Sequence, residues 1–247
     1  MAVHVARERL DKLLVARGLA PSRARAQALI AAGHVEVEGT QVDKPSDLVA
    51  EDAAIMLRET LRYVSRGGEK LAGALVDLQL SLADLVIADI GASTGGFSDC
   101  ALSEGARRVY AVDVGEGQLH ARLREDARVI SLERVNARTM TEASLPERVD
   151  LVLVDASFIG LGKLLPALCT LLVPGGRLLC LVKPQFEVGP EHVGKRGVVK
   201  DDVQRARAVD QVSETARALG LHKLGQAECR VPGPEGNREI FVLFGLP

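Results

Sequence analysis

Charged residues stand at four places where a folded core would favour apolar side chains. They are Lys70, Asp155, Lys183 and Glu239, and the last three each adjoin an apolar run. If those runs are strands of an open α/β sheet, Asp155 and Lys183 follow strand ends that meet at one edge, where ligands bind. A lone lysine at a strand end usually extends into solvent. Two amines and two carboxylates at adjacent positions favour a catalytic site instead.

A second group of residues surrounds a glycine-rich turn after the apolar run Val86–Ile90. Glycines allow the backbone to approach a ligand closely, and the helix that follows presents free N–H groups. The spacing Gly-x-x-x-Gly-Gly differs from the Gly-x-Gly-x-x-Gly of dinucleotide sites, and it lacks the Gly-Lys-Ser/Thr ending of a nucleoside triphosphate loop. The candidate cofactor-binding residues here are Asp89, Gly91, Ala92, Ser93, Thr94, Gly95, Gly96 and Phe97.

An acidic residue closes the next apolar run. Asp113, followed by Val114, lies about 20 residues beyond the turn, where a carboxylate accepts hydrogen bonds from ribose hydroxyls. S-adenosylmethionine fits better than NAD, because the turn must hold an amino-acid tail in place of a pyrophosphate. Asn136 and Ala137 would flank the adenine, and Asp155 would lie near the sulfonium. A tight turn, a solvent-facing carboxylate and an ordinary turn asparagine remain alternative interpretations.

Alternating strands and helices must position these residues. Apolar runs separated by helical stretches predict strands at Val86–Ile90, Val109–Val112, Val129–Leu132, Leu151–Val154, Arg177–Val182 and Ile240–Phe244. This alternation predicts an α/β fold with a Rossmann-like, doubly wound sheet that is mostly parallel and has an antiparallel C-terminal strand. We expect this domain at residues 67–247, after a linker at residues 61–66. Lys70 would open its first helix.

Residues 1–60 follow a different pattern. A leucine stripe predicts a helix that ends at Gly18, a second helix runs from Pro21-Ser22 to about Ala32, and Val35–Gly39 alternates as a strand and turn. Val42 and the stretch Leu48–Leu57 predict further short strands. The first 30 residues carry six basic and two acidic residues, so they could meet phosphates. The basic residues are Arg7, Arg9, Lys12, Arg17, Arg23 and Arg25.

Composition excludes several classes of protein. A chain of 247 residues with 47% hydrophobic residues can bury a sizeable core, which excludes overall disorder. A formal net charge of −2 excludes a uniformly basic binder. Four cysteines without a Cys-x-x-Cys pair predict no metal site, and no apolar run reaches membrane-spanning length. We expect a cytoplasmic, soluble protein without membrane association, and a monomer because no apolar stripe suggests a partner helix.

Longer phrases of the sequence resemble known families. The segment from Arg9 to Gly39 resembles the α-L RNA-binding motif that ribosomal protein S-four shares with pseudouridine synthases. The Lys-Asp-Lys-Glu order of the four charged residues resembles the FtsJ-type ribose 2′-O-methyltransferases. Over nearly its whole length, the chain also resembles a narrower group, the TlyA family of rRNA methyltransferases, which were historically also called haemolysins. The phrases that carry this resemblance are Ser65–Leu71, Gly91–Phe97, Asp155–Ile159, Val182–Glu187 and Pro232–Glu239.

The resemblance implies 2′-O-methylation of cytidine ribose by S-adenosylmethionine, in small- or large-subunit rRNA or both, near the subunit interface. Ribosomal subunits would be its partners. A ribose hydroxyl is a weak nucleophile and needs a base. Lys183 is the candidate, because desolvation and a second cation nearby, Lys70, both favour its neutral amine. Asp155 would orient Lys183, and Glu239 would hold Lys70.

Four further basic residues could guide RNA toward that site. The glycine-rich stretch Val188–Val199 predicts a mobile loop beside the catalytic strand end. The residues are Arg66, Lys195, Arg196 and Lys200, and ordinary solvated charges are an equally good interpretation of them.

Three alternatives remain at this stage. A small-molecule methyltransferase could use the same sheet, although it has no need of a basic N-terminal module. A haemolysin or other membrane-damaging factor is suggested by the older family name, but the sequence has no amphipathic membrane helix. An RNA-binding protein with an inactive methyltransferase domain would require a broken tetrad or cofactor loop, and both motifs are intact.

Overall fold

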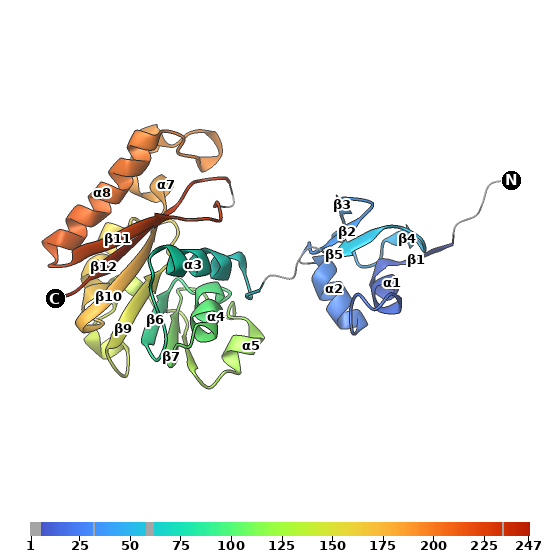
Figure 1. The fold of residues 1–247 in the computed structure, drawn as a ribbon, viewed down its shortest axis with the longest axis horizontal. Coiled ribbons are helices and arrows are strands. Elements are labelled where there is room, and N and C mark those ends of the chain that lie inside the picture. The colour runs from blue at the N-terminus through green and yellow to red at the C-terminus, as the bar shows by residue number, and fades with distance from the viewer. Residues whose placement is uncertain (1–5, 32, 58–61, 234) are drawn as a thin grey trace. The chain divides into compact units, whose positions relative to one another are not determined.

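The computed structural model describes residues 6–31, 33–57, 62–233 and 235–247 (Figure 1). The chain separates into two compact units, Met1–Leu61 and Arg62–Pro247. The expected helix end at Ala32 and the first linker residue, Leu61, lie outside the described residues.

Two helices and short strands build the N-terminal unit. The helices pack together through Leu10, Leu14, Leu29 and Ile30, which are buried with Val35 in one small apolar core. Both predicted helices are therefore confirmed, as is the strand that follows them. The elements are α1 (Leu10–Ala16), α2 (Arg23–Ala31), the antiparallel sheet β3 (Thr40–Gln41), β2 (Val35–Val37) and β5 (Ile55–Leu57), and the antiparallel pair β1 (Arg7–Arg9) and β4 (Leu48–Ala50).

A seven-stranded sheet forms the centre of the C-terminal unit. Its order is β11-β12-β10-β9-β6-β7-β8; the five strands from β10 to β8 run parallel, and β12 pairs antiparallel with β10 and β11. The doubly wound, mostly parallel sheet with an antiparallel C-terminal strand is confirmed. The strands are β6 (Val86–Ile90), β7 (Arg108–Val112), β8 (Val129–Leu132), β9 (Val149–Val154), β10 (Leu172–Val182), β11 (His222–Glu228) and β12 (Ile240–Gly245).

Helices cover both faces of this sheet, and its apolar side chains divide between two cores. Val86, Ala88 and Ile90 of β6 pack with residues of α6 and α8, whereas Ile87 packs with α3 and α4 on the other face. This division follows from the two-residue period of a strand. The helices are α3 (Arg66–Asp77), α4 (Gly96–Ser103), α5 (Ala121–Arg124), α6 (Leu165–Cys169), α7 (Pro184–Glu187) and α8 (Asp202–Ala218).

The structure corrects three sequence predictions. Helix α3 begins at Arg66, so Lys70 lies in its second turn and does not open the helix. Gly67 and Gly68 had suggested a later start, but they lie within α3, where a Cβ on Gly68 would come 2.2 Å from Tyr63 Cγ. Strands β9 and β10 begin earlier than predicted, and β10 includes Pro174 beside a register irregularity. The residues of the predicted linker from Arg62 onward belong to the C-terminal unit.

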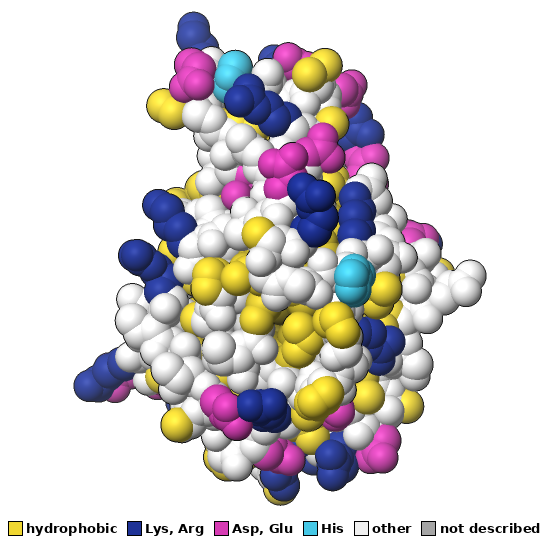
Figure 2. All heavy atoms as spheres, turned by 90° about the vertical axis from the view of Figure 1, so that its left-hand side faces the viewer, with side chains coloured by type: hydrophobic (Ala, Val, Ile, Leu, Met, Phe, Trp, Pro, Cys, Tyr) yellow, Lys and Arg dark blue, Asp and Glu magenta, His cyan; other side chains and the backbone are white. Residues whose placement is uncertain are grey.

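Strand β11 was missed altogether, because it is an edge strand with a largely exposed, polar sequence. Figure 2 shows that face of the C-terminal unit which lies on the left-hand side of Figure 1, where hydrophobic side chains gather between scattered charges. Leu224 of β11 is itself exposed. Within the described residues, no helix has the length and apolar character needed to span a membrane, and no cluster of three or more potential metal ligands occurs.

A substitution at Gly95 would measure how tightly the glycine-rich turn is packed. Its φ is +93°, and an added Cβ would lie 2.2 Å from Leu123 Cδ1. We predict that Gly95→Ala lowers the free energy of unfolding by about 2 to 5 kcal/mol, the sum of left-handed strain and overpacking. Urea unfolding followed by circular dichroism measures this change.

Gly117→Ala is the matched control. Gly117 has φ +67° but nothing within 4 Å of the added Cβ, so only the strain should remain, about 1 to 2 kcal/mol. Equal losses of unfolding free energy for the two variants would show that the packing of Leu123 against Gly95 adds nothing to the cost of the substitution.

Candidate active site

Lys183 and Asp155 form one ion pair at the carboxyl edge of the sheet. Lys183 directly follows β10 and Asp155 directly follows β9, and the parallel register pairs Cys180 with Val154. Lys183 Nζ lies 2.6 Å from Asp155 Oδ1 and donates a hydrogen bond of 2.7 Å to Ser157 Oγ. The Lys183 side chain is only 9% exposed, against 22% for Asp155, so the pair opens to solvent on the carboxylate side.

Lys70 and Glu239 form a second, more deeply buried pair. Lys70 Nζ donates to Glu239 Oε2 over 2.6 Å, and their side chains are 10% and 1% exposed. The antiparallel register between Val182 and Ile240 places Glu239, which directly precedes β12, opposite Lys183. Removing one partner would leave a buried charge unpaired, which is strongly destabilising. We call the four charged residues the lysine–carboxylate tetrad: two ion pairs formed by one residue of α3 and three residues next to the ends of β9, β10 and β12.

The glycine-rich turn borders this tetrad directly. Gly91 follows β6 with φ +81°, and a Cβ there would lie 2.8 Å from the backbone oxygen of Asp155. The amides of Gly91 and Ala92 both donate to Val112 O, which ties the turn to β7. Only glycine permits this approach of the turn to β9. The result is a cradle of backbone between β6 and the N-terminus of α4, directly beside Asp155.

Asp89 lies inside the protein instead of lining the cradle surface. It is fully buried in β6, and burial raises the pKa of its carboxyl to about 7. Ser98 Oγ of α4 donates to Asp89 Oδ2 over 2.6 Å, while Oδ1 has no hydrogen-bond partner among the described residues. Asp89 therefore anchors the start of α4 to β6. Phe97 is also a core residue, with its ring centroid 5.9 Å from that of Phe241.

Asp113 lies beside the cradle at the end of β7. Its Oδ2 accepts from Ser93 N over 2.8 Å and its Oδ1 from Gly115 N over 2.7 Å. Each carboxylate oxygen keeps a further lone pair for a ligand hydroxyl. Val114 is 74% exposed. The small pocket at this point is lined by Ala92, Ser93, Ala111, Asp113, Gly115, Gln118, Leu119, Ser131 and Glu133.

Asn136 and Ala137 do not line that pocket. Asn136 is exposed, and its side chain accepts from Arg138 N to cap the short 3₁₀ turn Ala137–Thr139. This is the role of a turn asparagine, one of the alternatives that the sequence left open. Of the remaining turn residues, Thr94 contributes its backbone oxygen to His120 N.

Sequence reasoning missed the aromatic and hydroxyl groups at the rim of the site. Ser157 contacts Lys183, as described, and the next residue, Phe158, is 91% exposed with φ +66°. Its ring centroid lies 5.3 Å from that of Phe186 in α7. Phe186 itself is half-buried, and an exposed ring such as that of Phe158 is a surface on which nucleobases can stack. The sequence signal was available, because both phenylalanines lie within the phrases that carry the family resemblance.

Several expected RNA-binding arginines of the N-terminal unit hold the fold together. Arg9 and Arg23 both form ion pairs with Asp11, which is fully buried and also accepts from Gln27. The hydrogen bond from Arg9, together with those from Gln27 and Arg23, holds the pKa of Asp11 well below its usual range. Arg17 donates to the backbone oxygens of Ala53 and Glu51.

Other expected cations of that unit remain available. Lys12 lies 3.6 Å from Glu8 in an exposed pair. Arg7 and Arg25 are exposed and have no ion pair within the described part of the chain. Among the cations of the C-terminal unit, Arg66 donates to Pro232 O over 2.9 Å, while Lys195, Arg196 and Lys200 are exposed. The structure thus separates cations with structural partners from cations that face solvent.

Strand order, glycine-rich turn and strand-end acid together define a Rossmann-like methyltransferase. Family models match the chain as an FtsJ-like methyltransferase over residues 63–246 and as an S4 domain over residues 8–55. The chain therefore belongs to the FtsJ-like methyltransferases, in the TlyA and haemolysin A branch that the following relatives represent.

Two curated relatives align over nearly the whole chain. The 16S/23S rRNA (cytidine-2′-O)-methyltransferase TlyA of Mycobacterium tuberculosis is 46% identical over 96% of this chain and 89% of its own length. Hemolysin A of Brachyspira hyodysenteriae is 36% identical over 96% of this chain and 99% of its own length. A solved structure of a Streptococcus thermophilus protein named as a haemolysin has a TM-score of 0.76 at 39% identity, covering 98% of this chain and 89% of that one.

Proposed function

We propose that this protein transfers a methyl group from S-adenosylmethionine to the ribose 2′-oxygen of cytidine in ribosomal RNA. The observation that carries the proposal is the contact between the two functional parts, because Gly91 of the turn abuts the backbone of Asp155 in the tetrad. A cofactor held in the turn would present its reactive group beside Lys183. The named activity of the Mycobacterium tuberculosis relative agrees with this assignment.

The residues present fit S-adenosylmethionine. The backbone of the turn between Gly91 and α4 would hold the amino-acid tail, and Gly91 allows this turn to lie directly against the backbone of Asp155. Asp113, whose carboxylate is already oriented by the amides of Ser93 and Gly115, would accept hydrogen bonds from the ribose hydroxyls. Bound S-adenosylmethionine supplies a methyl group on a sulfonium, which is ready for transfer to a nucleophile.

The tetrad supplies the proton chemistry that the 2′-hydroxyl requires. Lys183 is the candidate general base, because its Nζ lies at the carboxyl edge of the sheet beside the glycine-rich turn. Its Nζ would take the hydroxyl proton as the 2′-oxygen is methylated, while bound S-adenosylmethionine would supply the methyl group and keep the electron pair of the carbon–sulfur bond. Asp155, 2.6 Å away, stabilises the ammonium that results. Glu239 holds Lys70 in place, and in-line positioning provides much of the remaining rate.

RNA recognition is assigned to the N-terminal unit and to the rim of the site. The unit matches an S4 domain and exposes Arg7 and Arg25. At the rim, the Phe158–Phe186 pair offers a stacking surface for a base next to the reacting ribose. A small-molecule methyltransferase would need neither feature, which makes RNA the better substrate.

A direct test measures transfer of a radiolabelled methyl group to naked rRNA, 30S particles and 50S particles. Mass spectrometry of the products would then map 2′-O-methylcytidine. Labelling of an rRNA cytidine ribose supports the proposal. Label found only on bases or on small molecules would overturn it.

Asp113 should matter for cofactor binding. We predict that Asp113→Ala weakens S-adenosylmethionine binding by about 1 to 3 kcal/mol, because charged hydrogen bonds to the ribose are lost. Calorimetry measures the affinity, with the exposed Glu116→Ala as control. Tight NADH binding without S-adenosylmethionine binding would contradict the cofactor assignment.

Lys183 should matter for chemistry and not for cofactor affinity. We predict that Lys183→Ala abolishes methyl transfer while S-adenosylmethionine affinity stays nearly unchanged. Lys183→Arg should not rescue transfer, since a guanidinium remains protonated and cannot accept the hydroxyl proton. Single-turnover methylation and calorimetry separate the two steps. Activity within a few-fold of wild type would show that Lys183 is not the base.

The exposed arginines of the N-terminal unit should set the salt dependence of RNA binding. We predict that Arg7→Glu with Arg25→Glu weakens binding and lowers the slope of log affinity against log salt by roughly one unit for each lost phosphate contact. Filter binding at several salt concentrations measures the slope. Arg17→Glu is a fold control, because Arg17 holds backbone oxygens and its loss should lower stability. An unchanged slope in the double variant would contradict the assignment.

A further inference from the structure

The segment between α7 and α8, residues 188–200, is held at its far end by buried polar residues that the proposed chemistry does not use. It leaves the sheet just after Lys183 and carries Lys195, Arg196 and Lys200 before α8 begins. The sequence predicts a mobile loop here. The structure instead shows two 3₁₀ turns, and Val199 is only 1% exposed. Something must therefore fix the end of this cationic segment.

Asn237 makes the first of these contacts. Its side chain is buried, with the residue 3% exposed. Asn237 Nδ2 donates to Gly197 O over 2.8 Å, and Asn237 Oδ1 accepts from Val199 N over 3.0 Å. One amide thus satisfies backbone groups on both sides of Val198. Loss of this side chain would leave the buried N–H of Val199 without its partner, which is costly.

The backbone between these contacts is strained. Arg196 has φ 64° and ψ 20°, and Gly197 follows with φ 74°, so two successive residues are left-handed. Such a conformation is unfavourable for a bulky residue such as arginine and persists only where surrounding contacts enforce it. Gly194 N also bonds to Val198 O and closes the turn. The side-chain amide of Asn237 binds the carbonyl of Gly197, the residue directly after Arg196, and so helps to fix the backbone from which the Arg196 side chain extends.

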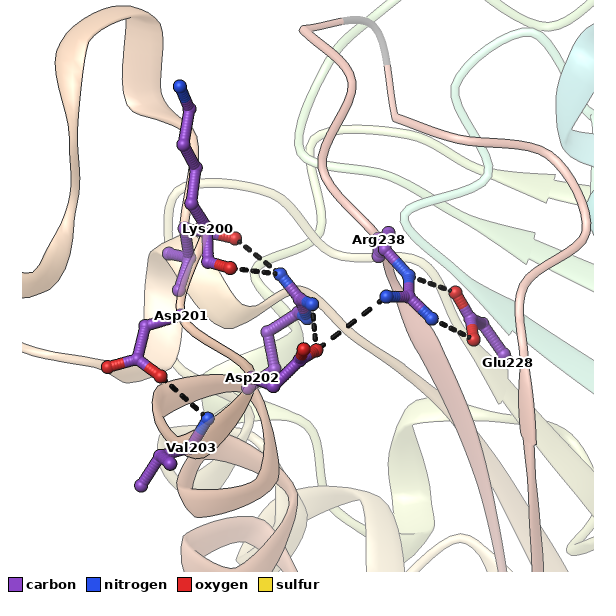
Figure 3. Close-up of polar contacts among 8 residues, drawn as sticks. Lys200, Asp201, Asp202, Val203, Glu228 and Arg238 are labelled. Carbon is purple, nitrogen blue, oxygen red and sulfur yellow. Dashed lines mark hydrogen bonds and ion pairs between the residues drawn. The ribbon is translucent and has the colours of Figure 1, made fainter.

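Arg205 makes the second contact, from α8. Its Nη1 donates to Val199 O over 3.0 Å and to Lys200 O over 2.9 Å, and Arg205 also pairs with Asp202. Figure 3 shows how this network continues from Asp202 to Arg238 and on to Glu228 of β11. The segment is therefore clamped by Arg205 on one side and by Asn237 on the other.

The position of Asn237 in the chain connects this clamp to catalysis. Arg238 holds α8 and β11, and the next residue, Glu239, holds Lys70. Three consecutive residues thus fix the cationic segment, the sheet edge and the buried ion pair of the tetrad. The segment follows α7, which begins directly after Lys183, so one tetrad residue lies shortly before the segment in the chain and another, Glu239, lies two residues after Asn237.

We infer that Asn237 is a positioning residue, which holds Lys195 and Arg196 where they bind phosphates of the RNA strand that enters the active site. The inference rests on the proposed function, because it names how that site receives its substrate. Cations on a fixed segment lose little conformational entropy on binding, whereas the same cations on a loose loop bind more weakly. Asn237 acts through the segment and touches neither substrate nor cofactor.

Limited trypsin digestion of the full chain tests the clamp without reference to activity. Trypsin cleaves after Lys195, Arg196 and Lys200 only when this segment opens. We expect Asn237→Ala to speed cleavage there about 10-fold, since two hydrogen bonds no longer oppose opening. Arg205→Lys, which keeps the charge but loses the planar fork, should speed it as well. Gln211→Ala, at an exposed position of α8, should leave it unchanged. Cleavage at the wild-type rate in both clamp variants would overturn the inference.

A double-mutant cycle tests the functional role. Lys195→Ala with Arg196→Ala should raise KM for ribosomal particles about 10-fold in the wild-type background, with kcat and S-adenosylmethionine affinity nearly unchanged. In the Asn237→Ala background the same pair should raise KM less than about 2-fold, because the cations are already misplaced. Fully additive effects would overturn the inference and show that Asn237 acts apart from the segment.

The two proposals fail in different ways. A wild-type protein that methylates no rRNA cytidine would defeat the proposed function, whatever the digestion shows. A wild-type protein that methylates rRNA, together with an Asn237→Ala variant of unchanged KM, would defeat only the inference about Asn237. A fall in kcat alone in Asn237→Ala would also defeat it, since that result points to Glu239 and the tetrad.

Discussion

The buried ion pair between Lys70 and Glu239 is the constraint on which the C-terminal unit depends. It joins α3, which precedes every strand of the large sheet, to the last strand, β12. Both charges are almost removed from water, so each depends on the other for compensation. An apolar pair of similar shape would hold the same elements together without the cost of removing two charges from water. In the proposed mechanism the two charges have a further role, because Glu239 lies opposite Lys183 in the register and holds Lys70 beside the site.

Glycine determines how closely the cofactor turn and the tetrad approach each other. Gly91 lets the turn contact the backbone of Asp155, and Gly96 lets α4 contact the start of α3, where its Cβ would lie 2.2 Å from Ser65 Oγ and 2.9 Å from Gly68 N. Apart from Ser65, the close neighbours are backbone atoms, which cannot move aside as a flexible side chain can. The glycine-rich turn and Asp155 are therefore positioned largely by main-chain geometry.

The sequence predicted the strand ends of the site well, because a charged residue after a buried apolar run has few structural explanations. Asp155 and Lys183 were placed at adjoining strand ends on this ground, and the register agrees. The sequence predicted the ends and the presence of individual elements less well where contacts with residues distant in the chain determine them. Helix α3 begins before its glycines because Tyr63 packs against Gly68, and β11 is a strand because β12 supplies partners for a polar sequence. The role of Asn237 was likewise not predicted, since its two hydrogen-bond partners lie about 40 residues away in the chain.

Charge placement also explains how a protein of net charge −2 can bind a polyanion. Counting basic residues overstates the attraction, because Arg9 and Arg23 both pair with Asp11, which offsets one of their two charges, and Arg17 donates to backbone oxygens. The tetrad holds two cations and two anions, so it does not itself attract phosphate. Binding must come from cations that keep their charge exposed, and affinity falls with salt in proportion to how many of them meet phosphates. A few such residues suffice only if they are held in fixed directions. The contacts of Asn237 and Arg205 would meet this requirement for Lys195 and Arg196. Such a role goes beyond the stability of the fold.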